Sequence, residues 1–243
     1  MYPLLIDTHC HFDEATTIQT QLAEALSANV KVIAIGGNEK MNSNVAASGT
    51  WFTQGFDWSS DPTLPMPKIL PNQVGVGELG FDFHYEQGPE ALQRQCKNFE
   101  RQAEVARIAN LPIVVHTREA DEVTYEALKA AALPATGVIH SYTGDIPFAR
   151  KLLDLGYYIS ISGIVTFRNA EMLRETAKYI PEDRLLIETD SPYLAPVPLR
   201  GKVNRPVNVR VTADFIAALR GCSKDAFAAM TTTNAARCFK LEL

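Results

Sequence analysis

The chain has 243 residues, of which 46% are apolar and 21% charged, and this composition excludes the disordered and fibrous classes of protein. A net charge of −5 excludes a protein that coats nucleic acid through overall positive charge. Any polyanion must therefore bind to a local basic patch or to bound cations. Because single α/β barrels reach roughly 250 residues, the length favours one domain over residues 1–243.

The spacing of the cysteines contains no C-x-x-C pair, so it predicts neither a thiolate zinc site nor a disulfide framework. Cysteines of this kind are typical of a protein in a reducing compartment. The cysteines are Cys10, Cys96, Cys222 and Cys238. No stretch reaches the roughly 18 uninterrupted apolar residues that a membrane span needs. We therefore expect a cytoplasmic protein without membrane association, and we infer no obligate protein partner.

Short apolar runs recur at regular intervals, and several lack polar alternation, as expected of parallel strands that are buried on both faces. The predicted strands are 4–6, 30–35, 51–56, 74–79, 111–115, 137–139, 157–161 and 185–187. Helical segments lie between most of these strands, at 18–28, 89–110, 120–132, 146–155, 170–179, 207–220 and 224–239.

The alternation of strands and helices predicts an α/β fold, a (β/α)₈ TIM barrel, with an open doubly wound sheet as the alternative. The third βα unit is irregular, because the prolines that follow Phe56 exclude a regular helix. They are Pro62, Pro65, Pro67 and Pro71. We expect a loop in this unit, with at most one helical turn.

Four of the five histidines lie at the carboxyl ends of predicted strands: His9, His11, His116 and His140. Two carboxylates, Glu78 and Asp190, occupy similar positions. In a barrel all strands run in one direction, so these side chains converge at one mouth. One histidine at a strand end is more often structural, but a buried cluster without cations would carry a large desolvation cost.

His9 and His11 are two residues apart and lie on the same strand face, where both can bind one ion. Four imidazoles and two carboxylates are too many ligands for one tetrahedral ion. They suit two ions about 3.5–4 Å apart that share a bridging carboxylate and water. We therefore predict two divalent metal ions per chain, with Mg, Mn and Zn all open.

Residues 75–80, GVGELG, match the glycine pattern of dinucleotide-binding proteins. FDFHYE follows instead of an apolar-periodic helix, so no helix N-terminus is available for a pyrophosphate. We therefore exclude dinucleotide binding. His84, in the same stretch, lacks the strand-end placement and is expected in a loop that lines the cleft.

The chain resembles the TatD family of metal-dependent hydrolases, within the amidohydrolase-like barrels. The motifs that carry the resemblance follow the order of that family along the chain. They are DTHCHFD at 7–13, GELGFDFHY at 77–85, LPIVVHTREA at 111–120, GVIHSYTG at 137–144, ETDSPYLAP at 188–196 and RGKVNRP at 200–206. The chain departs from the family pattern in two motifs: Asp57-Trp58 replaces His-Pro, and Arg205 replaces a glutamate.

The resemblance implies a divalent-metal-dependent phosphodiesterase that acts on nucleic acid, a deoxyribonuclease with exonuclease character. RNA remains open as a further substrate. The resemblance also implies that His9, His11 and Asp190 hold the first ion. His116 and His140 would hold the second ion, and Glu78 would bridge the two.

Two cations lower the pKa of a shared water and neutralise phosphate oxygens. We expect the resulting hydroxide to attack phosphorus while Asp190 orients it and accepts its proton. The predicted catalytic residues are therefore Asp190 and Glu78.

A basic stretch near the last strand could hold flanking phosphates, although solvated surface charge explains each of these residues equally well. The predicted substrate contacts are Arg118, Arg200, Lys202, Arg205 and, for stacking on bases, Tyr85 and Tyr142. Two alternatives stay open: an ester or amide hydrolase, such as a deacylase of aminoacyl-tRNA, and a non-catalytic metal-binding homologue.

Overall fold

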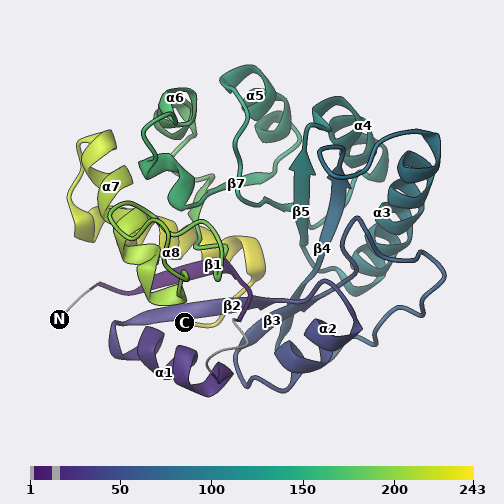
Figure 1. The fold of residues 1–243 in the computed structure, drawn as a ribbon, viewed down its shortest axis with the longest axis horizontal. Helices are drawn as coiled ribbons and strands as arrows, with labels where there is room; N and C mark the ends of the chain where they lie inside the picture. The colour runs from purple at the N-terminus through teal and green to yellow at the C-terminus, as the bar shows by residue number, and fades with distance from the viewer. Residues whose placement is uncertain (1–2, 13–16) are drawn as a thin grey trace.

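A computed structural model of the protein, which describes residues 3–12 and 17–243, contains an 8-stranded parallel sheet in the order β1 to β8 (Figure 1). A parallel bridge between Cys10 and Ser191 joins the end of β1 to the segment after β8, so the sheet curves into a barrel. The predicted TIM barrel is confirmed. The strands are Leu5–Cys10, Val30–Ile35, Trp51–Gln54, Gln73–Asp82, Ile113–Arg118, Gly137–Ile139, Tyr158–Ile161 and Leu185–Ile187.

Helices surround the strands on the outside of the barrel (Figure 1). Helices α1 to α8 span Ile18–Ser27, Glu39–Ala46, Pro89–Ala109, Asp121–Ala131, Ile146–Asp154, Glu171–Tyr179, Val209–Arg220 and Lys224–Phe239, with 3₁₀ turns at Gly163–Thr166 and Pro206–Asn208. Within the described part of the chain, every helix is too short or too polar to cross a membrane.

The interior of the barrel positions the candidate site. Val114, Val138 and Leu186, from three different strands, pack together in one buried apolar cluster. Side chains on a strand alternate between its faces, so the residues two positions further along share this inward face. These residues are His116, His140 and Glu188. The alternation therefore places polar groups at the mouth of the barrel, directly above its apolar core.

Residues 55–72, all of which are described, form turns and extended segments without a helix, so the expected irregular third unit is confirmed. Side chains of α3 bind this loop instead. Gln102 Oε1 accepts a hydrogen bond from Phe56 N, and Gln102 Nε2 donates one to Phe56 O, both at 2.8 Å. Asn98 Nδ2 donates to Ser60 O at 2.6 Å. One helix face thus satisfies backbone groups that a regular βα unit would pair internally.

Helix α2 and the carboxyl ends of β1, β4 and β5 were not predicted. Helix α2 escaped prediction because most of its residues are polar; its beginning is fixed by Asn38, whose Oδ1 accepts a hydrogen bond from Met41 N at 2.9 Å. Strand β4 continues to Asp82, three residues past the predicted end at Leu79. This extension adds Asp82 to the strand that carries Glu78.

Replacing Gln102 by alanine should lower the free energy of unfolding by about 2–4 kcal/mol, because two buried backbone groups of Phe56 lose their partner. Urea denaturation measures this loss. Gln93→Ala, at an exposed position of the same helix, is the matched control and should change stability little. Equal effects of the two substitutions would contradict the role assigned to Gln102.

Candidate metal centre

The two carboxylate oxygens of Glu78 face two different pairs of histidines. Oε2 lies 3.5 Å from Nε2 of both His9 and His11. Oε1 lies 3.1 Å from His116 Nδ1 and 3.0 Å from His140 Nε2. A single carboxylate therefore lies between two imidazole pairs, with one oxygen directed at each pair.

The geometry of these groups fits cation binding. The facing nitrogens are 3.2 Å apart in the pair His9–His11 and 3.1 Å apart in the pair His116–His140. Ligands at about 2.0 Å from a tetrahedral ion are separated by about 3.3 Å. If both nitrogens of a pair carried hydrogens, these would clash, whereas two lone pairs directed at one cation would not. The donor set is the imidazole and carboxylate chemistry that Zn²⁺ and similar divalent ions accept.

Asp190 completes the first group of ligand atoms. Its Oδ1 lies 3.7 Å from His9 Nε2 and 3.9 Å from His11 Nε2, and its side chain is 16% exposed. The backbone of Asp190 has a φ of 55°, in the left-handed region that aspartate tolerates better than most residues. Its N–H donates to His9 O at 2.9 Å, which ties the segment after β8 to β1.

The buried carboxylate of Asp7 strengthens this connection. Its Oδ1 accepts from Thr189 N at 2.8 Å and from His9 N at 3.3 Å, and its Oδ2 accepts from Thr189 Oγ1 at 2.5 Å. These bonds close the barrel at the place where Asp190 follows β8. Residues more than 180 positions apart in sequence are thereby held against each other.

Glu78 and His9 carry the charge states that suit cation binding. Burial opposes ionisation of Glu78, but the nearby charge of His140 and hydrogen bonds from His11 and His116 lower its pKa well below the usual value. Burial, with a smaller contribution from His140, lowers the pKa of His9 to about 4. Burial, followed by the charges of Glu188 and Glu78, raises the pKa of Asp190 to about 7. At neutral pH Glu78 is therefore anionic and His9 neutral. At His11, His116 and His140 burial opposes protonation, but the neighbouring carboxylates outweigh it and raise the pKa of each ring, so a cation must displace protons from them.

Groups outside the candidate ligand set face the far sides of three of the four imidazole rings. His11 Nδ1 lies 3.1 Å from Ile35 O, and His140 Nδ1 lies 3.4 Å from Glu188 Oε1. His116 Nε2 lies 3.0 Å from Asp82 Oδ2. Asp82 was missed from the sequence, although it lies four residues after Glu78 and alternation along the strand could have revealed it.

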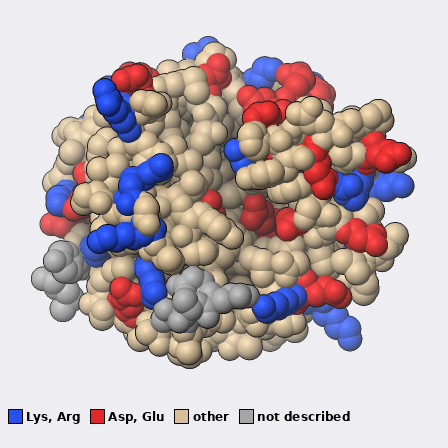
Figure 2. Space-filling view, in the orientation of Figure 1, with Lys and Arg blue, Asp and Glu red and all other residues tan. Residues whose placement is uncertain are grey.

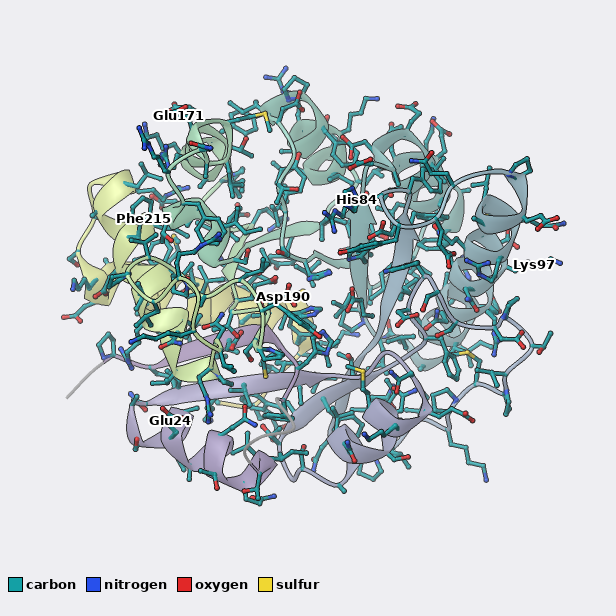
Figure 3. The ribbon with its side chains drawn as sticks, in the orientation of Figure 1. Glu24, His84, Lys97, Glu171, Asp190 and Phe215 are labelled. Atoms are coloured by element: carbon teal, nitrogen blue, oxygen red, sulfur yellow. The ribbon has the colours of Figure 1, made fainter. Side chains whose placement is uncertain are left out.

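A cleft of about 720 Å³ opens beside the centre, and both His11 and Glu78 line it. Trp58 and Tyr85 form part of its wall, with ring centroids 5.7 Å apart and planes 8° from parallel. The guanidinium of Arg118 lies 5.0 Å from the centroid of the Tyr85 ring. Figure 3 labels Asp190 near the centre of this face and His84 toward β5, in the same mouth of the barrel.

The other predicted phosphate contacts lie in the segment after β8. Arg200 and Lys202 are exposed, and the Arg200 guanidinium lies 3.8 Å from the centroid of the Phe167 ring. Arg205 Nη1 lies 3.7 Å from Glu24 Oε2, an ion pair that reduces its availability to substrate. Figure 2 shows acidic atoms near the middle of this face and basic atoms both on its left side and around its top and right.

Tyr142 does not fit the predicted role in base stacking. Its side chain is 1% exposed, and its ring lies 6.1 Å from that of Phe148. Its hydroxyl donates to Asp145 O at 2.7 Å. The tyrosine therefore packs in the core, which the sequence alone did not reveal. Asp13, the last residue of the first motif, lies outside the described residues.

A family model described as "TatD related DNase" matches residues 68–240. The chain belongs to this family. The stretch that it matches contains Glu78, His116, His140 and Asp190, while His9 and His11 precede it.

Two curated relatives in bacteria are named metal-dependent hydrolases. The uncharacterized metal-dependent hydrolase YcfH of Escherichia coli K12 is 49% identical over 170 residues, which cover 70% of this chain and 63% of the relative. The match thus spans less than two thirds of the length of YcfH. The uncharacterized metal-dependent hydrolase YabD of Bacillus subtilis is 33% identical over 256 residues, covering 98% of this chain and all of the relative.

Solved structures agree with the TatD family fold. The crystal structure of YJJV, a TatD homolog from Escherichia coli, has a TM-score of 0.85 and 26% identity over 98% of both chains. A TatD family hydrolase from Entamoeba histolytica has a TM-score of 0.81 at 18% identity, covering 98% of this chain and 99% of its own, and supports the fold alone.

Substituting Glu78 by glutamine should reduce the bound metal from two ions per chain to one or fewer, because the amide removes the charge shared by both histidine pairs. Elemental analysis after equilibration with Mn²⁺ and removal of excess metal measures the stoichiometry. Glu100→Gln, at an exposed position of α3, is the control. An unchanged content of two ions in Glu78→Gln would refute the bridge.

Proposed function

We propose that this chain is a divalent-metal-dependent phosphodiesterase that hydrolyses nucleic acid, DNA first, with RNA as a further substrate to be tested. The observation that carries the proposal is the position of Glu78 between two imidazole pairs, beside an open cleft. One cation would be held by His9, His11, Asp190 and Glu78 Oε2. The other would be held by His116, His140 and Glu78 Oε1.

When bound, two divalent cations lower the pKa of a water molecule and neutralise the charge of a phosphodiester. Asp190, partly exposed beside the centre, orients the attacking water and accepts its proton through a carboxylate oxygen. Burial of His9 keeps bulk water from the inner side of the centre. Glu78 keeps the two histidine pairs at a fixed separation throughout the reaction.

The cleft and the residues beside it supply groups for a nucleotide chain. Arg118 is exposed at the end of β5, where its guanidinium can neutralise a flanking phosphate. Tyr85 is 65% exposed and offers a flat surface to a base, a contact that tolerates any sequence. The family description and the relatives' shared name, metal-dependent hydrolase, support this assignment.

We also propose a cytoplasmic location. The four cysteines are free thiols, and Cys10 and Cys238 are buried. Free thiols are typical of proteins that work in a reducing compartment.

Hydrolysis of labelled oligonucleotides after chelation and defined addition of metal tests the proposed function. Single-stranded DNA, duplex DNA and RNA are compared with an aminoacyl ester and a lactone. We expect phosphodiester cleavage that disappears with the chelator and returns with Mg²⁺ or Mn²⁺. Hydrolysis of the ester or lactone by a metal-loaded protein that leaves every oligonucleotide intact would contradict the proposal.

The substitution Asp190→Asn should lower kcat on an oligonucleotide about 10²–10⁴-fold, because an amide cannot accept the proton of the attacking water. Circular dichroism should match the unmodified protein, since the backbone bond to His9 remains. Asp154→Asn, at an exposed position of α5, controls for the change of charge. Full activity of Asp190→Asn would eliminate this residue as the base.

A further inference from the structure

The carboxylate of Asp82 holds two parts of the site at once. Its Oδ2 lies 3.0 Å from His116 Nε2. Its Oδ1 accepts hydrogen bonds from the backbone N–H groups of His84 at 2.9 Å and Tyr85 at 3.0 Å. The side chain is 1% exposed, so water does not compete for these bonds. One oxygen serves the histidine, and the other serves the loop that carries Tyr85 into the cleft.

The backbone of Asp82 is fixed from the side of α3. Gln95 Oε1 accepts from Asp82 N, and Gln95 Nε2 donates to Asp82 O, both at 3.0 Å. Gln95 is fully buried. The peptide groups on both sides of the carboxylate are thereby held, and the carboxylate has little freedom to turn away from His116.

These contacts determine which nitrogen of His116 carries the proton. A carboxylate oxygen only accepts hydrogen bonds, so His116 Nε2 must donate to Asp82. Cation binding requires the neutral ring, and in that form the lone pair lies on Nδ1, the atom that is 3.1 Å from both Glu78 Oε1 and His140 Nε2. Without this constraint, the ring could equally place its proton on Nδ1, where it would block a cation.

We propose that Asp82 is a positioning residue that fixes the tautomer and orientation of His116 for the second cation and anchors the loop at 83–85. This inference rests on the ligand role of His116 in the proposed function. It assigns to Asp82 a specific chemical task that differs from general support of the fold.

Asp82→Asn separates the two tasks of the side chain. The two backbone N–H groups require an acceptor, so the amide oxygen must take the place of Oδ1. The amide nitrogen then faces His116 and donates to Nε2, which moves the proton of the ring to Nδ1. The substitution therefore preserves the loop and disables the ligand.

Titration with Mn²⁺ and Zn²⁺, followed by calorimetry and elemental analysis, measures the effect. We expect Asp82→Asn to weaken the second ion about 10–100-fold while the first ion and the urea midpoint stay unchanged. Asp61→Asn is the matched control, because Asp61 also accepts from a backbone N–H, that of Thr63 at 2.8 Å, in a loop outside the centre. It should bind both ions normally.

If Asp82→Asn binds two ions with the affinity of the unmodified protein, the inference about Asp82 is wrong and the ligand assignment stands. Fewer than two ions in the unmodified protein would overturn the ligand assignment and this inference together. These readouts need no substrate, so absence of nuclease activity is a separate result.

Should Asp82→Asn fail to fold, a second measurement uses the unmodified protein. Long-range ¹H–¹⁵N correlation spectra of the Zn²⁺-loaded form report the state of each ring nitrogen of His116. We expect a protonated Nε2 and a metal-bound Nδ1. The reverse assignment would overturn the inference.

Discussion

The negative charge of Glu78, shared between two histidine pairs, is the interaction on which the centre depends. His9 and His140 come from different pairs, yet their rings stack 3.9 Å apart and 11° from parallel. Imidazoles this close and this deeply buried repel one another when protonated and lose their hydration. Glu78 offsets both costs, because it directs one oxygen of its negative carboxylate at each pair. The centre also requires that residues distant in sequence lie close together. The barrel meets this requirement, because it brings the ends of its strands to one mouth.

Helix α3 has a second function besides covering the barrel. Gln95 holds Asp82 at the end of β4, and Gln102 holds Phe56 in the loop after β3, each by a pair of hydrogen bonds to one residue's backbone. The bonds from Gln95 hold the end of β4 beside His116. The bonds from Gln102 hold the start of the loop that places Trp58 against Tyr85. The lack of a helix in the third unit is therefore compensated by polar side chains. This arrangement leaves room for the cleft beside the centre.

Much of this architecture could be predicted from sequence, because apolar runs and residues at strand ends are local signals. His116 and His140 follow buried runs directly, and the barrel dictates their convergence. Burial that depends on tertiary packing could not be predicted: Tyr142 contains the same ring as Tyr85 but lies in the core. The pairing of Arg205 with Glu24 likewise joins segments that no local pattern relates. Alternation of side chains along a strand would place Asp82 on the same face as Glu78, but the strand was expected to end at Leu79.

The most direct test of the account is anomalous X-ray diffraction from crystals grown with Mn²⁺. The account predicts two anomalous peaks about 3.5–4 Å apart, one beside each oxygen of Glu78. A single peak, or peaks remote from Glu78, would contradict it.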